Sequence, residues 1–96
     1  MGIDGFNELI HAPNRLQICA MLISVAEMEF KAIKLQLDVS DSVLSKHIKA
    51  LQDEGYVKQE KRTNKLGRPN TWVAITEHGK KRFTAHVNAL RQIVGS

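Results

Sequence analysis

Four hydroxyl or ammonium side chains gather on the outer face of a helix that the sequence predicts between residues 40 and 54. At about 100° per residue they fall opposite or beside the apolar stripe of that helix; they are Ser42, Ser45, Lys46 and Lys49. Serine hydroxyls are short donors that allow close approach, and lysine ammonium groups can reach phosphate oxygens or base acceptors. This chemistry suits contact with a nucleic acid. A solvated helix face, with Lys49 and Asp53 as an ion pair at i, i+4, would show the same pattern.

The apolar spacing and the end signals of this segment predict the helix itself. Leu44, Ile48 and Leu51 recur at i, i+4 and i+7, so they share one stripe. Ser40 suits the N-cap, where its hydroxyl can accept hydrogen bonds from the free N–H groups of the first turn. Gly55 suits the left-handed position that follows the last turn. The stripe should face a core and leave the hydroxyl and ammonium groups outside.

A basic hairpin is predicted directly after this helix. Two β-prone runs, 56–62 and 71–75, flank a loop that is rich in Asn, Gly and Pro. The candidate contacts on the hairpin are its cations, Lys61, Arg62, Lys65 and Arg68. Pro69 biases Arg68 toward extended backbone, which would project the guanidinium from the tip toward a minor groove or a phosphate. A solvated loop with scattered cations is the other interpretation, but the order of helix and hairpin favours DNA.

Positive charge is concentrated in the second half of the chain. Residues 1–55 carry five Lys/Arg against eight Asp/Glu, a balance of −3, whereas residues 56–96 carry nine against two, a balance of +7. Such asymmetry is expected of a polyanion-binding surface. A membrane surface would attract the same charge. However, no basic amphipathic helix with large exposed apolar side chains accompanies it, so we expect no membrane partner.

Length and composition predict one small domain, residues 1–96, in a reducing compartment. With 96 residues, 43% of them hydrophobic, the chain can build one core. No apolar run reaches the roughly 18 residues that span a bilayer, and no leader-like segment opens the chain. A single cysteine cannot form an internal disulfide, so a cytoplasmic location is expected. No nucleophile–base pair, phosphate loop or paired carboxylates stand out, which predicts neither an enzyme nor a cofactor.

The remaining segments are predicted to supply the scaffold. Residues 2–10 show a one-sided apolar pattern for a short helix. The segment from Pro13 to about Ala26 is apolar nearly all round and is typical of a central core helix. Residues 27–29 suit a short strand that closes a small sheet with the hairpin. Phe30, Ile33 and Leu37 mark the first helix of a helix-turn-helix.

The last predicted helix, 76–94, carries a seam that could join two copies. Its apolar residues recur at intervals of 4, 3 and 4; they are Phe83, Val87, Leu90 and Val94. We predict that part of this seam pairs with a second copy, with help from Ile3, Phe6 and Leu9. The alternative is that the seam packs on its own domain. A symmetric dimer would offer two helices to a near-palindromic site with half-sites about one helical turn (~34 Å) apart.

The lone candidate residues have plainer interpretations. Cys19 lies in the most apolar segment, which favours a buried, inert thiol over a redox switch. His47 is expected to pack beside the core stripe, although a phosphate contact is conceivable. His78 and His86 are eight residues apart without Cys or carboxylate partners, so no metal site is predicted. Trp72 is expected to be a core or dimer aromatic rather than a platform for base stacking.

Taken in order, these motifs resemble the small winged-helix transcriptional regulators related to the MarR and ArsR groups. The resemblance covers residues 30–91 through five pieces: Phe30-x-x-Ile33, Leu44-Ser45-Lys46-His47-Ile48-x-x-Leu51, Glu54-Gly55-Tyr56-Val57, Gly67-Arg68-Pro69-x-Thr71-Trp72 and Ile75-Thr76-x-x-Gly79. Upstream, Pro13-x-Arg15-Leu16-x-Ile18 also fits. Two positions depart from the pattern. Asp38 stands where glycine is common in the turn, but Asp tolerates a left-handed conformation. Gln59 replaces an apolar strand residue, which predicts looser packing inside the wing.

The resemblance implies a dimeric prokaryotic repressor or activator that binds operator DNA through the helix beginning near Ser40 and the wing around Arg68. The single cysteine does not supply the cysteine pair of ArsR-type metal sensors, and an effector is left open. We therefore predict an α+β, mainly α winged helix-turn-helix with a core at residues 13–75 and terminal dimerisation helices at 2–10 and 76–94. Its predicted function is a sequence-specific, double-stranded-DNA-binding regulator acting as a homodimer. The alternative is a winged-helix protein-interaction module without DNA affinity.

Overall fold

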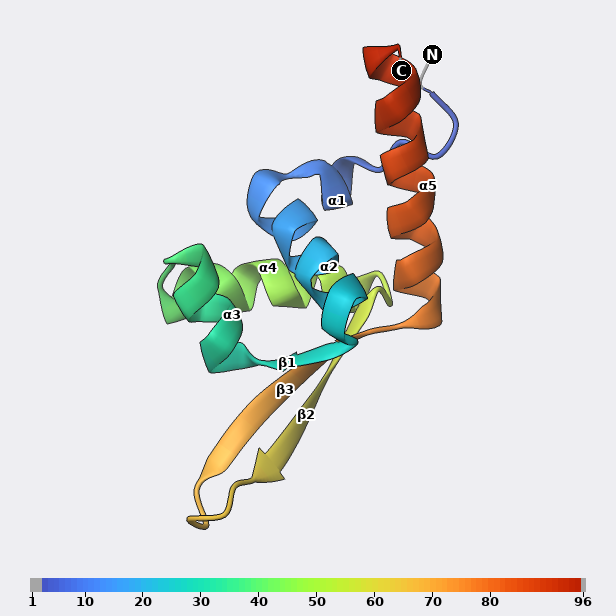
Figure 1. Ribbon diagram of the computed structural model, residues 1–96. Helices are drawn as coiled ribbons and strands as arrows, with labels where there is room; N and C mark the ends of the chain where they lie inside the picture. Colours follow the sequence, from blue (N-terminus) through green and yellow to red (C-terminus); the bar gives the residue numbers. More distant parts are fainter. Residues whose placement is uncertain (1–2, 96) are drawn as a thin grey trace.

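In the computed structural model, which describes residues 3–95, five helices pack around a three-stranded sheet, and a long hairpin projects from them (Figure 1). In chain order the elements are α1 (Glu8–His11), α2 (Pro13–Val25), β1 (Glu27–Glu29), α3 (Phe30–Leu37), α4 (Asp41–Asp53), β2 (Val57–Thr63), β3 (Pro69–Ile75) and α5 (Glu77–Val94). This arrangement confirms the predicted winged helix-turn-helix of the α+β, mainly α class. No helix in the described part of the chain is both long and apolar enough to cross a membrane.

The first predicted helix is wrong in its extent. Helix α1 begins only at Glu8, and the described residues before it form a turn in place of the helix expected over 2–10 (residue 2 lies outside the described residues). Asn7 is extended, and its side-chain oxygen accepts from the Ile10 N–H at 3.0 Å, which makes it the N-cap. Gly5 has a φ of +88°, and a Cβ there would lie 2.8 Å from the backbone oxygen of Ala85 in α5. The chain thus needs glycine to pass close to α5, and the apolar pattern alone did not show this.

Helix α2 is the central core helix, as predicted. Ile18, Cys19 and Leu22 are fully buried within it. The helix ends at Val25, and its C-cap residue Ala26 has a φ of +73° and donates its N–H to the carbonyl of Leu22. The carbonyl of Ala26 accepts from the Ile75 N–H at 3.3 Å, so the end of the helix is tied to the sheet.

The helix-turn-helix forms through local caps. Asp38 ends α3 in the left-handed conformation (φ 54°, ψ 52°), as expected of an Asp that replaces glycine. Ser40 caps α4 by accepting from the Val43 N–H at 3.2 Å. An ion pair of 2.9 Å between Lys34 and Asp41 joins the two helices across the turn.

The predicted three-residue strand β1 is present and forms one edge of an antiparallel sheet of order β1-β3-β2. Met28 pairs with Val73, and Val57 pairs with Ile75, so their side chains share the face that packs on the helices. The opposite face bears polar and aromatic side chains, namely Glu27, Glu29, Lys58, Glu60, Arg62 and Trp72. The β2–β3 hairpin reaches well beyond the helices (Figure 1).

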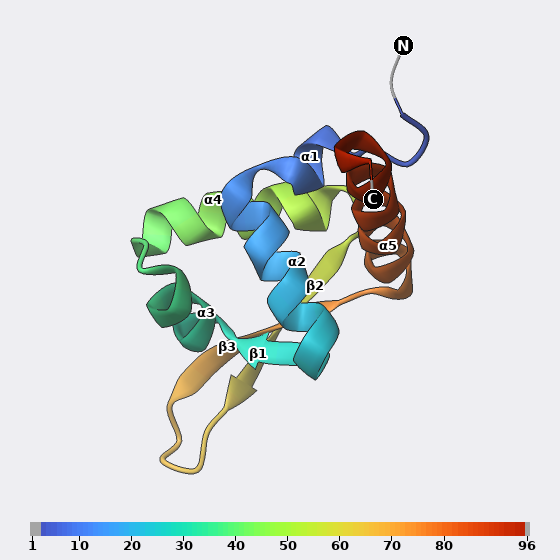
Figure 2. The same ribbon diagram turned by 45° about the horizontal axis from the view of Figure 1, so that its top comes forward.

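Helix α5 stands on the side of α2 that faces away from α3 (Figure 1 and Figure 2). Thr76 caps it by accepting from the Gly79 N–H at 2.9 Å. Gly79, His86 and Ala89 form its buried side. The last turn is exposed, with Val94 73% accessible, so the predicted seam is exposed to solvent at this end.

Candidate nucleic-acid interface

Helix α4 presents the predicted polar face to solvent. Ser42, Ser45, Lys46 and Lys49 are all exposed, while the opposite stripe is fully buried. The hydroxyl of Ser42 lies 3.2 Å from that of Ser40, which is engaged in capping. Lys49 makes an exposed ion pair with Asp53 at 3.0 Å, as the solvated-face interpretation expected. Lys46 has no ion-pair partner among residues 3–95, so its charge is available to a ligand.

The wing divides its cations between two faces. Lys61 pairs with Thr71 and shares the sheet face of Val73, the face turned toward the helices. On the same face, Gln59 donates to Gln52 of α4 at 2.6 Å. Gln59, which replaces the usual apolar strand residue, therefore links the wing to α4.

Arg62 lies on the outer face and is bound within the chain. Its guanidinium donates to both carboxylate oxygens of Glu27 at 2.9 and 3.1 Å and to Glu60 at 2.8 Å. It also lies 4.9 Å from the centre of the Trp72 ring. These hydrogen bonds raise the pKa of Arg62 and lower the pKa of Glu27 and of Glu60. Arg62 thus ties β2 to β1.

The tip of the wing is fully exposed. The Asn64 side-chain oxygen accepts from the N–H groups of Leu66 and Arg68, both at 2.9 Å, and Gly67 has a φ of +79°. Lys65 and Arg68 have no ion-pair partners within the described residues. The tip lies at the opposite end of the molecule from the free end of α5 (Figure 1 and Figure 2). The face of α4 and the wing tip are two separate candidate contact regions, because α4 lies among the helices and the tip extends beyond them (Figure 1).

His47 holds α4 against α2 and was only partly anticipated. It is half-buried beside the core stripe, as predicted, and its Nδ1 lies 3.2 Å from the Arg15 guanidinium. Burial, followed by the charges of Arg15 and Lys46, lowers the pKa of His47, which keeps the ring a neutral acceptor for Arg15. Arg15 also donates to the carbonyl of Leu9. No sequence pattern pairs Arg15 with a histidine 32 residues away.

A buried polar network between the N-terminal segment and α5 was missed. The Asn7 N–H donates to His86 Nδ1 at 3.0 Å, so the proton of the neutral ring sits on Nε2, which lies 3.2 Å from His11 Nδ1. Asn7 also donates through its side chain to the Tyr56 hydroxyl at 2.9 Å. Burial, then the neighbouring His11, lowers the pKa of the fully buried His86. His78 instead stacks on Tyr56, and no metal-binding cluster occurs within residues 3–95.

The residues predicted to join two copies lie in different environments. Phe6 stacks edge-on against His86 at 4.9 Å, and Leu9 and Phe83 pack against the core. Val87 and Leu90 are half-buried, whereas Ile3 and Val94 are exposed. The exposed Ile93 was not in the predicted set. An apolar surface thus remains at the outer end of α5.

The fold and these exposed cations define a winged-helix DNA-binding protein. A family model described as a winged helix DNA-binding domain matches residues 14–94, and the chain belongs to this family. It is 31% identical to an uncharacterised protein of Methanocaldococcus jannaschii over 88 residues, which span 92% of this chain and 90% of the relative.

Solved structures agree with this family. A transcriptional regulator homologue from Pyrococcus horikoshii superposes with a TM-score of 0.85 at 28% identity, covering 92% of this chain and 86% of that one. The fold is also shared with a putative transcriptional regulator of Thermoplasma acidophilum, with a TM-score of 0.73 at 23% identity over 92% of each chain. The chain thus belongs to a winged-helix DNA-binding family and shares its fold with solved transcriptional regulators of the MarR/ArsR type.

Proposed function

We propose that this regulator binds a near-palindromic operator as a homodimer and reads it sequence-specifically. One observation carries the DNA-binding part of the proposal: cations that have no ion-pair partner among the described residues stand exposed on both α4 and the wing of one protomer. The proposed base-reading residues are Ser42, Ser45 and Lys46, with Ser40 and Lys49 at the border of the groove. Lys61, Lys65 and Arg68 would bind the phosphate backbone and minor groove.

Two of the predicted contact residues, Lys49 and Arg62, have ion-pair partners within the chain, and this changes the role that we propose for Arg62. The Lys49–Asp53 pair is exposed on both sides, and pairs of this kind contribute only about 0.3–0.5 kcal/mol, so Lys49 can exchange Asp53 for a phosphate. Arg62 is already bound to two carboxylates. We therefore assign Arg62 chiefly to holding the wing in position.

We further propose that the outer half of α5 forms the dimer interface. Leu90 and Val94 belong to a seam on α5, and Ile3 adds an exposed apolar side chain of the N-terminal segment. A symmetric pair of α5 helices would bury these side chains. Acting on chromosomal DNA of a prokaryotic cell, the dimer would work in the cytoplasm without catalysis.

Leu90→Asp is expected to convert the dimer into a monomer, because a carboxylate would be buried unpaired at the interface. Sedimentation at equilibrium measures the mass, and circular dichroism verifies that the helices remain folded. Leu35→Asp is a matched control, since Leu35 is 72% exposed on α3, outside the proposed interface. A Leu90→Asp protein that sediments as the dimer would refute this assignment of the interface.

The experiment that tests the DNA-binding proposal is the affinity for fragments selected from genomic DNA, measured as a function of salt. Counterion release makes phosphate contacts salt-sensitive. A protein-interaction module would show no such dependence.

A further inference from the structure

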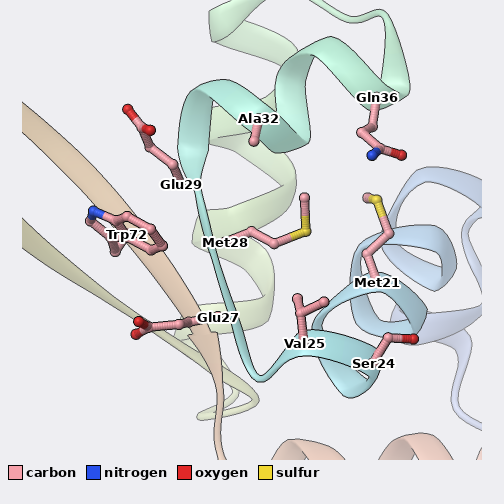
Figure 3. Close-up of a pocket in the computed structure, with 9 residues that line it drawn as sticks. All are labelled: Met21, Ser24, Val25, Glu27, Met28, Glu29, Ala32, Gln36 and Trp72. Atoms are coloured by element: carbon pink, nitrogen blue, oxygen red, sulfur yellow. The ribbon is translucent and has the colours of Figure 1, made fainter.

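A groove with a volume of about 480 Å³ lies along the edge of the sheet, away from the proposed DNA contacts. Strand β1 is an edge strand, and the groove runs over it between α2, α3 and the wing strand β3. Figure 3 shows the side chains that line it. The volume falls within the roughly 300–1,000 Å³ of small-molecule sites. None of the residues proposed to contact DNA or a second copy lines this groove.

The groove has an apolar half and a half with aromatic and acidic side chains. Met28 extends from β1 toward Met21 of α2, and Val25 closes the lower end (Figure 3). Methionine side chains adapt to ligands of irregular shape. On the other side of the strand stand Trp72 and Glu29 (Figure 3). A ligand that fills the groove would therefore touch apolar surface at one end and a carboxylate at the other.

The charges of the groove favour a cation. Two glutamates and no Lys or Arg are among its lining residues, although the whole chain carries a net charge of +4. Glu27 is neutralised by the bidentate contact with Arg62. Glu29 is half-buried and has no ion-pair partner within residues 3–95. The groove is thus lined by one paired carboxylate, Glu27, and by one that has no ion-pair partner among the described residues, Glu29.

We propose that this groove binds a small amphipathic organic cation, an aromatic or alkyl ammonium compound. Its apolar body would lie on Met21, Met28 and Val25, and its charged group would lie beside Glu29 and the Trp72 ring. An anionic ligand would meet repulsion from Glu29, because the nearby Arg62 guanidinium over the Trp72 ring is already paired with Glu27 and Glu60. The proposal rests on the groove alone and stands whether or not the chain binds DNA as a dimer.

The single tryptophan gives a direct test, because Trp72 lines the groove. Benzyltrimethylammonium is titrated into the millimolar range against the full chain while the tryptophan emission is recorded. We expect a saturable change with this cation and none with phenylacetate or benzyl alcohol, which carry the same ring with a negative charge or no charge. Absence of a saturable change, or an equal response to phenylacetate, would overturn the proposal.

Two variants locate the binding. Glu29→Gln should weaken the cation about fivefold, the upper range for a partly exposed ion pair, whereas Glu54→Gln, outside the groove, should leave the affinity unchanged. Ala32→Leu adds bulk on the α3 wall and should abolish binding without altering any charge. An unchanged affinity in folded Glu29→Gln contradicts the charge assignment. If Glu29→Gln fails to fold, Ala32→Leu is the deciding variant, and unchanged affinity for the cation in Ala32→Leu would show that the cation does not bind in this groove.

Discussion

The Lys46→Ala, Arg68→Ala double variant is expected to bind DNA roughly 10³-fold more weakly than the wild type. Lys46 projects from α4 and Arg68 from the wing tip, and neither has an ion-pair partner in the described chain. In a dimer the change removes about four charged contacts to DNA, and about sixfold for each near 0.15 M salt through counterion release gives a loss of roughly 10³. Fluorescence anisotropy with a labelled fragment measures the loss.

A second double variant tests whether the loss of affinity depends on these two positions or only on the net charge of the protein. Lys81→Ala with Arg82→Ala removes the same two charges from exposed positions in the first half of α5, away from the proposed dimer interface. We expect less than a tenfold loss there, because only long-range attraction is reduced. Equal losses in the two double variants would contradict the assignment of α4 and the wing tip as the DNA-binding surface.

Gly79→Ala is expected to destabilise the fold by about 3 kcal/mol, at the upper end for overpacked positions. Gly79 is buried in the first turn of α5, where an added Cβ would overlap the carbonyl oxygen of Tyr56 and lie 2.9 Å from its carbon. The Tyr56 carbonyl is itself fixed by the Thr76 N–H at 2.9 Å, so the backbone cannot easily yield. The free energy of unfolding in urea measures the effect.

Gly67→Ala is the matched control for this substitution. Gly67 has a positive φ, +79°, unlike the helical Gly79, and nothing lies within 4 Å of an added Cβ. Only the left-handed backbone is penalised there, at about 1 kcal/mol. If Gly79→Ala were no less stable than Gly67→Ala, the close packing of α5 on the root of β2 would be wrong.

Local signals were sufficient to predict the helix-turn-helix and the wing. The stripe of Leu44, Ile48 and Leu51 is buried as its spacing requires, and Ser40 caps the helix. Asp38 adopts the left-handed turn. Each of these features depends on residues a few positions apart, so sequence alone contains the necessary information.

Features that depend on distant residues were not predictable in this way. The N-terminal helix starts late because Asn7 binds His86, 79 residues away. Arg62 of β2 pairs with Glu27 of β1, which is 35 residues away in the sequence. This pair can be identified only once the sheet order and register are known, because β3 lies between the two strands. An alternating strand pattern shows that Lys61 and Arg62 face opposite ways, but not which face carries the carboxylates. These contacts determine which cations remain available to DNA.

The salt dependence of DNA affinity tests the central claim most directly. Fragments are first selected from genomic DNA by the full chain, and their affinity is then measured between about 50 and 200 mM salt. With three to five phosphate contacts in each protomer, the affinity should fall by roughly 10³ or more over this range. The selected fragments should share an inverted repeat with half-sites about one helical turn apart. Affinity that stays constant with salt, with no shared repeat, would contradict the account and favour a protein-interaction module.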